Sequence, residues 1–182
     1  MLDIVPTAVQ WRKFGEDPDI ATGYFHWPLL ANVEVAVKLI QAYGGAQWVR
    51  DAHSRLTGPS ALAKERVYSD NAVEVYAELF GKEETLRGSC EDYKAGAKLE
   101  VEEQEGDQKE GRKIGVPTLV MFSKAMLGRR IDVAEEWKDW VGEGVELEAV
   151  GVEDGAGHYL PEEACELVGG KIVEFVAKKV RH

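Results

Sequence analysis

A continuous apolar run reads Val116-Pro117-Thr118-Leu119-Val120-Met121-Phe122, which is typical of a strand buried on both faces of a parallel sheet. Outward from this run, residues 131–141 have helical periodicity, residues 145–151 alternate apolar side chains with glutamate, and residues 162–180 predict a C-terminal helix. Pro161 and the acidic residues after it suit the first turn of that helix. Strand, helix, strand and helix in this order predict an α/β fold with a parallel sheet.

The start of the chain predicts another strand of the same sheet. Residues 2–5 look like the end of a strand that Pro6-Thr7 stops. Two or three parallel strands are fewer than a sheet buried on both faces usually contains. We therefore expect one half of a larger fold, in which residues 1–7 end a core strand and residues 114–182 form the C-terminal part of the α/β core.

The region between these two parts, residues 8–97, is predicted to be helical. Residues 32–43 carry an apolar stripe with i, i+3/i+4, i+7 spacing, which indicates an amphipathic helix. A second helix is expected to start at Ser69-Asp70, which are good N-cap residues, and a third spans residues 83–97. Residues 98–113 (KLEVEEQEGDQKEGRK) are acidic and contain two glycines, which predicts a solvated acidic linker.

Composition limits the possible partners and compartment. The 22 Lys and Arg residues against 33 Asp and Glu give a net charge of −11. This balance argues against nucleic acid and against a membrane surface, because both favour basic patches, but it allows a small-molecule substrate. Cys90 and Cys165 show no metal-ligand spacing, and the chain has neither a targeting pattern at residues 1–6 nor a membrane-length apolar run. These features predict a reduced, cytoplasmic protein.

The loop before the C-terminal helix carries the candidate general base. It reads Gly155-Ala156-Gly157-His158-Tyr159-Leu160-Pro161-Glu162-Glu163 and places His158 at the C-terminal edge of the predicted sheet, where open α/β folds have their sites. Asp3, at the end of the first strand, could accept the Nδ1 proton of His158 and fix its tautomer, as a catalytic triad requires. Taken singly, each has a simpler interpretation: a histidine in a mobile loop and a strand-end cap.

Three further side chains are candidate hydrogen-bond donors. His26 and Trp27 are adjacent, and Tyr93 belongs to the segment Glu91-Asp92-Tyr93. Imidazole, indole and phenol groups all donate, and tryptophan can only donate. Three convergent donors in an aromatic pocket suit a developing anion. Taken alone, each would be an interior aromatic side chain with its polar end satisfied.

Four segments, in this order and at this spacing, resemble the fluoroacetate and haloacetate dehalogenases. They are residues 2–7 (LDIVPT), 24–27 (YFHW), 90–97 (CEDYKAGA) and 157–163 (GHYLPEE). The resemblance covers nearly the whole chain. It implies a partial α/β-hydrolase fold, in which a helical lid over residues 8–97 is followed by the C-terminal strand–helix units of a parallel sheet.

The resemblance also implies a role for each candidate residue. Asp3 would be the triad acid, and His158 would be the base that activates water. The donors to the departing halide would be His26, Trp27 and Tyr93. In the family, an aspartate on a strand-to-helix turn displaces the halide and forms an ester, which activated water hydrolyses to release a 2-hydroxy acid.

The family's nucleophile, its carboxylate-binding arginines and its oxyanion-hole segment all lie upstream of the position that matches Asp3. The nearest match to a nucleophile elbow, G-x-(S/D)-x-G, is residues 151–155 (GVEDG), where the acid is misplaced. We therefore expect the 182-residue chain by itself to be inactive, because losing one triad member removes most of the rate. Smaller departures from the family are Lys94 in place of arginine, Ser123-Lys124 after the strand, and a long segment at 144–154.

Two other functions fit the same residues. An epoxide hydrolase of the same superfamily would use His26 and Tyr93 to protonate the epoxide oxygen, whereas a third donor at Trp27 favours a halide. A truncated, non-catalytic remnant is the alternative from another class. Such a half-domain would expose a sheet edge and apolar helix faces, so that it would form a homodimer or aggregate.

No cofactor is expected, because the implied reaction needs only water and the histidines show no metal-ligand spacing. The four histidines are His26, His53, His158 and His182.

Overall fold

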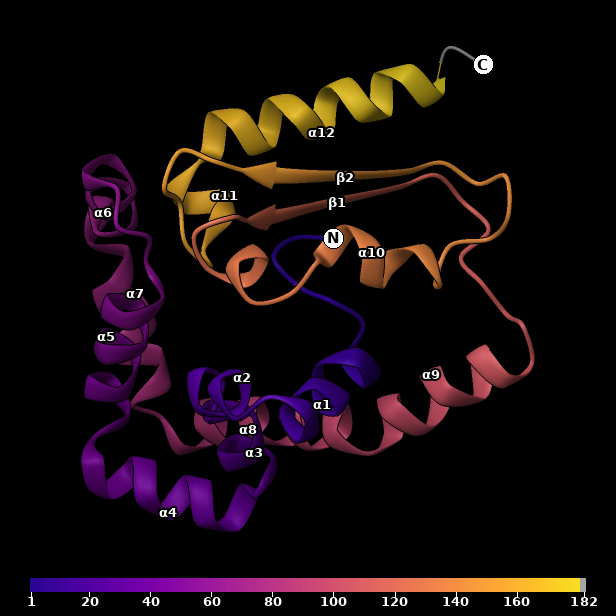
Figure 1. Cartoon of the computed structure of the whole chain (residues 1–182). Helices are drawn as coiled ribbons and strands as arrows, with labels where there is room; N and C mark the ends of the chain where they lie inside the picture. The colour runs from indigo at the N-terminus through magenta and orange to yellow at the C-terminus, as the bar shows by residue number, and fades with distance from the viewer. Residues whose placement is uncertain (181–182) are drawn as a thin grey trace. The chain divides into compact units, whose positions relative to one another are not determined.

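The computed structural model describes residues 1–180, so that His182 lies outside the described part, and Figure 1 labels its helices and strands. The chain divides into two compact units. Unit 1 consists of Met1–Val5, Arg55–Asp70 and the residues from Lys113 onward, and unit 2 of Pro6–Ser54 and Asn71–Arg112. The region predicted as one helical lid, residues 8–97, is therefore interrupted, because Arg55–Asp70 belong to unit 1.

Unit 1 is built on a parallel pair of strands. β1 (Thr118–Ser123) and β2 (Leu147–Val152) pair residue by residue along their whole length. Leu2 forms a parallel bridge to Met121 of β1, so the strand end predicted at the start of the chain is part of this sheet. The indole Nε1 of Trp137 donates to the main-chain oxygen of Ile4 at 2.9 Å and holds the N-terminal segment in place. The α/β fold with a parallel sheet is confirmed.

Helical segments that lie wholly in the described part of unit 1 complete it. They are α6 (Ala61–Val67), η2 (Leu127–Arg129), α10 (Val133–Lys138), α11 (Leu160–Glu163) and α12 (Cys165–Val180). The helix predicted over residues 162–180 is divided, because Ala164 leaves helical geometry with φ −134° and ψ 44°. α12 runs beside the strand pair (Figure 1). A buried core joins the strands, the histidine loop and the last two helices, and consists of Met121, Val152, Ala156, Leu160, Ala164 and Val168.

Unit 2 is helical. Its elements are α1 (Thr7–Glu16), α2 (Pro18–Gly23), α3 (His26–Ala31), α4 (Val33–Tyr43), most of α5 (Gly45–Leu56), α7 (Ala72–Phe80), α8 (Glu83–Ala97) and α9 (Leu99–Lys109). The bounds of α8 are those predicted, and α4 differs from its prediction by one residue. The apolar stripe of α4 packs on α8 through a core of Leu30, Val33, Ala36, Val37, Ile40, Leu86 and Cys90.

The segment predicted as an acidic linker, residues 98–113, is a helix over most of its length. Glutamate, glutamine and lysine are good helix formers, and the acidic first turn of α9 complements the positive end of the helix dipole. Thr7 Oγ1 donates to Glu100 Oε2, and the Ala8 N–H donates to Gln104 Oε1, both at 2.9 Å. None of the residues of α9 is buried, so the segment is solvated, as predicted, while being ordered against α1.

The helix predicted to start at Ser69-Asp70 begins three residues later as α7. Asp70 and Asn71 have φ values of 52° and 59°, in the left-handed region that interrupts a helix. Residues 69–71 instead form the 3₁₀ turn η1 (Ser69–Asn71). Within residues 1–180, no helix combines the length and the apolarity that crossing a membrane requires.

Candidate active site

Asp3 is held at the C-terminal end of β1 by main-chain and side-chain bonds. Its N–H donates to the main-chain oxygen of Met121 at 2.7 Å, and its backbone adopts a φ of 47°. A left-handed conformation at a non-glycine residue costs free energy and is found where the surrounding structure enforces it. The side chain is buried, and its Oδ1 accepts the N–H of Ser123 at 2.8 Å. The carboxylate is thereby fixed in one orientation.

His158 meets this carboxylate. Its Nδ1 lies 2.8 Å from Asp3 Oδ2, while the imidazole side chain is 43% exposed and the Asp3 side chain 3% exposed. When Nδ1 donates its proton to Asp3, Nε2 is left as the acceptor. A half-exposed imidazole in this tautomer can take a proton from water, which is the task of a general base.

Close main-chain packing positions the histidine loop. The His158 N–H donates to the main-chain oxygen of Leu56 at 2.9 Å. A Cβ atom on Gly157 would lie 2.3 Å from both Gly58 N and Leu56 O, and one on Gly58 would lie 2.1 Å from Gly155 O. Only glycine fits at positions 58 and 157. The segment before α6 is therefore part of the support of the site.

Two side chains that the sequence analysis did not select also support this loop. Ser123 is fully buried, and its Oγ donates to Ala156 O at 2.6 Å and accepts the N–H of Met126 at 3.0 Å. Glu163 is 1% exposed, and its carboxylate accepts the main-chain N–H groups of Gly58, Gly157 and Tyr159. The adjacent acids Glu162-Glu163 after Pro161 could have indicated an inward-facing carboxylate, although not which of the two it is.

The three predicted donors lie together in unit 2. The ring of Tyr93, on α8, makes edge contacts with both His26 and Trp27, at the start of α3, with centroid distances of 5.9 Å and 5.6 Å. The ring of Trp11 packs at 6.0 Å from Trp27, and the ring of Phe14 also lies 6.0 Å from Trp27. The three side chains are therefore neighbours in an aromatic cluster, and their role as hydrogen-bond donors to a substrate stays a prediction.

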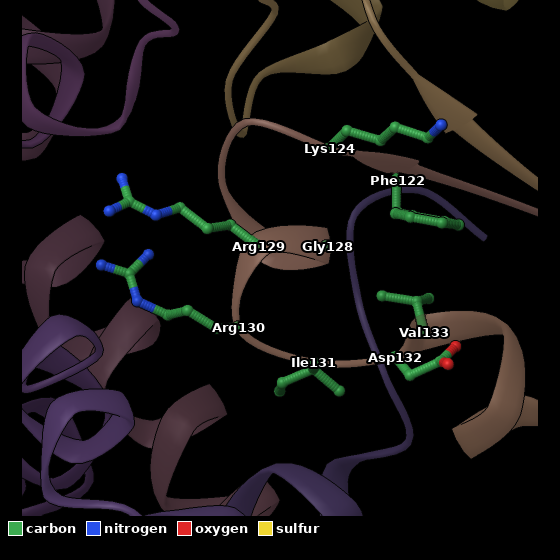
Figure 2. A pocket seen from close by; sticks show the side chains of 8 residues that line it. All are labelled: Phe122, Lys124, Gly128, Arg129, Arg130, Ile131, Asp132 and Val133. Carbon is green, nitrogen blue, oxygen red and sulfur yellow. The ribbon is translucent and has the colours of Figure 1, made fainter.

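A separate hollow of about 490 Å³ opens in unit 1 beside the end of β1. Figure 2 shows the side chains of Arg129 and Arg130 extending together, away from Phe122 and Val133. Lys124, which also lines it, pairs with Glu153. Neither Asp3 nor His158 lines this hollow. Among residues 1–180, no group of three or more histidine, cysteine or acidic side chains is arranged to hold a metal ion.

Solved structures similar to this chain are α/β hydrolases and relatives of that fold, whereas no protein-family model matches it. A provisionally named α/β hydrolase from Nostoc sp. PCC 7120 is 29% identical, with a TM-score of 0.81 over 96% of this chain and 56% of that chain. A provisionally named epoxide hydrolase from Pseudomonas aeruginosa is 26% identical, with a TM-score of 0.81 over 97% and 55%. A provisionally named acyltransferase from Salmonella enterica is 22% identical, with a TM-score of 0.82 over 97% and 55%.

The chain spans about 55% of the length of these structures. The chain therefore has the fold of the C-terminal part of an α/β hydrolase.

Proposed function

We propose that this chain is the C-terminal part of a hydrolase that works through a covalent ester, with His158 as the base and Asp3 as its partner. The observation that carries the proposal is the 2.8 Å contact between His158 Nδ1 and the buried Asp3 carboxylate. It couples an accessible imidazole to a fixed acceptor at the C-terminal edge of a parallel sheet, where α/β folds carry out their chemistry.

The proposed reaction has two steps. A carboxylate supplied by the upstream half attacks the substrate carbon, so that a C–O bond forms and the leaving group departs with the electron pair of the broken bond. His158 Nε2 then takes a proton from water, and the resulting hydroxide attacks the ester carbonyl. Cleavage of the ester regenerates the carboxylate and releases an alcohol, and the proton on His158 returns to solvent.

For the substrate we propose a short 2-halo acid. His26, Trp27 and Tyr93 would donate hydrogen bonds to the departing halide, since anion development is stabilised by preorganised donors. Their mutual ring contacts support a preformed donor set. The second candidate is an epoxide, in which His26 and Tyr93 would protonate the ring oxygen. The similarity to a provisionally named epoxide hydrolase supports this alternative.

Activity of the whole protein requires the part of the fold that precedes Asp3 in the similar structures. We propose that a longer polypeptide or a second chain supplies it, and that residues 1–182 alone do not turn over substrate. Measuring the mass of the native protein, with peptide mass spectrometry searched upstream of Met1, tests this point. Upstream peptides with an aspartate on a nucleophile elbow, or a second chain that carries one and is bound in the native complex, would support the enzyme. A native product of 182 residues with no such partner chain would contradict it.

The reaction itself is tested by trapping the ester in the complete protein. His158→Asn removes the base but leaves the first step intact, so the variant should release one equivalent of halide from a 2-halo acid and stop. The intact mass should rise by the mass of the carboxyalkyl group that replaces the halide, whereas the wild type should turn over without accumulating this adduct. Ester formation from an epoxide but not from a 2-halo acid would favour the second candidate, and absence of both adducts would contradict the proposal.

A further inference from the structure

Glu163, the last residue of α11, is a buried acid with both carboxylate oxygens occupied. Its Oε2 accepts the N–H of Gly58 at 2.8 Å and that of Gly157 at 2.5 Å, and its Oε1 accepts the N–H of Tyr159 at 2.8 Å. The residue is 1% exposed. Burying a carboxylate is costly unless hydrogen bonds replace its water, and here three main-chain donors do so.

Two of these bonds hold the residues directly before and after His158. Gly157 and Tyr159 donate to Glu163, and the N–H of His158 between them donates to Leu56 O at 2.9 Å. Three consecutive amides of the loop are therefore held by fixed acceptors. Since Gly58 and Leu56 belong to the segment before α6, one side chain ties that segment, the histidine loop and α11 together.

The main chain of Glu163 is also fixed. Its N–H donates to the main-chain oxygen of Tyr159, the N-cap residue of α11, at 2.8 Å, and its carbonyl oxygen accepts from Arg66 Nη1 on α6 at 3.1 Å. The carboxylate thus projects from an anchored backbone toward the loop. A freely rotating surface glutamate could not hold the loop in a single conformation.

We propose that Glu163 is a positioning residue that holds the His158 loop so that Nδ1 faces Asp3. This role rests on the proposed function only in naming His158 as the base. Catalytic side chains must be held to within about 0.5 Å of their productive positions, and the 2.8 Å His158–Asp3 contact joins residues 155 positions apart in the chain. The Glu163 carboxylate fixes the main chain around His158, and the N–H of Ser123 fixes the Asp3 carboxylate.

The proposal explains why a carboxylate is needed at this position. Glutamine has one carbonyl oxygen, which could accept from Gly58 and Gly157, but its amide group would then place N–H donors against the N–H of Tyr159. Aspartate is one methylene shorter and cannot span the same three donors. Glu163→Gln is therefore nearly isosteric and should disturb the loop without creating a cavity.

The test uses the ¹⁵N-labelled chain and the exchange of the His158 Nδ1 proton with water, measured by NMR. In the wild type this proton should exchange slowly, because it is hydrogen-bonded to a buried carboxylate. In Glu163→Gln it should exchange about tenfold faster or more, as expected from the loss of about one hydrogen bond with a donor left unpaired. Glu162→Gln is the control, because it removes the same charge one residue away while Glu163 still accepts from the three amides. Its Nδ1 exchange rate should equal that of the wild type.

An unchanged Nδ1 exchange rate in a folded Glu163→Gln variant would overturn the proposal. Should that variant fail to fold, wild-type amide exchange decides: the amides of Gly58, Gly157 and Tyr159 should be protected to the same extent as the Nδ1 proton. Rapid exchange of these amides beside a persistent Nδ1 proton would equally overturn it. Both readouts are independent of turnover, so a complete protein, with its upstream half, that is inactive but keeps a protected Nδ1 proton would contradict the proposed function and leave the role of Glu163 intact.

Discussion

Asp3 and Ser123 are 120 residues apart in the chain, and the Oδ1 of the first accepts the main-chain N–H of the second at 2.8 Å. The other carboxylate oxygen of Asp3 faces His158. One oxygen therefore anchors the acid to the end of β1, while the other is left for the imidazole. This division allows the two contacts to be separated by mutation.

Asp3→Asn should keep the Ser123 contact through its carbonyl oxygen and present an N–H₂ group to His158. The imidazole would then need to accept at Nδ1, which leaves its proton on Nε2, the wrong tautomer for a base. We expect kcat of the complete protein to fall by roughly 10⁴-fold, with little change in melting temperature. Steady-state kinetics checks this expectation, with Asp92→Asn, an exposed acid on α8, as the control. Retention of full activity in Asp3→Asn would exclude Asp3 as the triad acid.

Gly157→Ala should destabilise unit 1. The added methyl would lie 2.3 Å from Gly58 N and Leu56 O, which are main-chain atoms that cannot move aside cheaply. Overpacking of this kind costs about 1–3 kcal/mol in the free energy of unfolding. Urea denaturation measures the loss. Gly169→Ala on α12 is the matched control, because that position is open and alanine is favoured over glycine in a helix; equal effects at both sites would refute the steric argument.

The two cysteines should differ in reactivity, and burial of Cys90 should make the stability of the protein depend on pH. Cys165 is exposed and should react with a thiol reagent in the native protein, whereas Cys90 is buried and should react only after unfolding. Burial raises the pKa of the Cys90 thiol. Its folded pKa therefore lies above the unfolded value of about 8.5, so its stabilising contribution is present below that value and is lost as pH rises through the folded pKa.

Cys90→Ala isolates this contribution. The cavity that it creates lowers the free energy of unfolding by the same amount at all pH values. The variant has no thiol to ionise, so that it does not share the loss of stability that the wild type undergoes at high pH. The difference in unfolding free energy between wild type and variant should therefore shrink as pH rises above about 8.5. A difference that stays constant up to pH 10 would show that the thiol does not titrate in this way.

Trp27 decides between the two proposed substrates. In the complete protein, Trp27→Phe should lower halide release by about 10²- to 10³-fold, the effect of removing one donor to a developing anion. Ring opening of an epoxide should be affected less, because His26 and Tyr93 would serve that reaction. Trp48→Phe, which alters a tryptophan packed against the α4–α8 core, controls for loss of aromatic packing. Equal losses with both substrates would remove the argument for a halide.

The isolated chain should self-associate through apolar residues of α12. Val176 lies four residues after Ile172 and three after Val173, so that the three side chains share one face of the helix. They are 40% (Ile172), 68% (Val173) and 51% (Val176) exposed, and exposed apolar patches promote association. Val173→Lys should shift the protein toward monomer in light scattering. Ala177→Lys adds the same charge at an exposed position without removing a large apolar group. A monodisperse wild-type monomer would contradict this expectation.

The parts of the fold that were predictable from sequence are those with strong local patterns. The apolar run before Ser123 and the alternation before Val152 predict β1 and β2, because a buried strand needs such residues whatever surrounds it. α4 and α8 were predictable to within one residue from their periodicity. Of the candidate site, the contact between Asp3 and His158 and the proximity of His26, Trp27 and Tyr93 were predictable from the order of the motifs, whereas the catalytic and donor roles of these residues stay predictions.

The remaining features depend on contacts that a local pattern does not contain. α9 is ordered by Glu100 and Gln104 against the start of α1, a pairing across more than 90 residues. Arg55–Asp70 belong to unit 1, in which Leu56 accepts the His158 N–H and Gly58 donates to Glu163, contacts across about 100 residues of sequence. Glu163 looks like a surface acid next to Glu162, and only the folded loop distinguishes the buried member of the pair.

The long separation of the site residues has a consequence for synthesis of the protein. Asp3 is translated 155 residues before His158, and both unit 2 segments are completed between them. Contacts between distant residues form late, because closing a long loop is entropically costly. Until the loop that carries His158 has emerged from the ribosome, the Asp3 carboxylate has no histidine partner. Until α11 and α12 follow, the nascent unit 1 exposes apolar surface of its sheet, the kind of surface that chaperones bind.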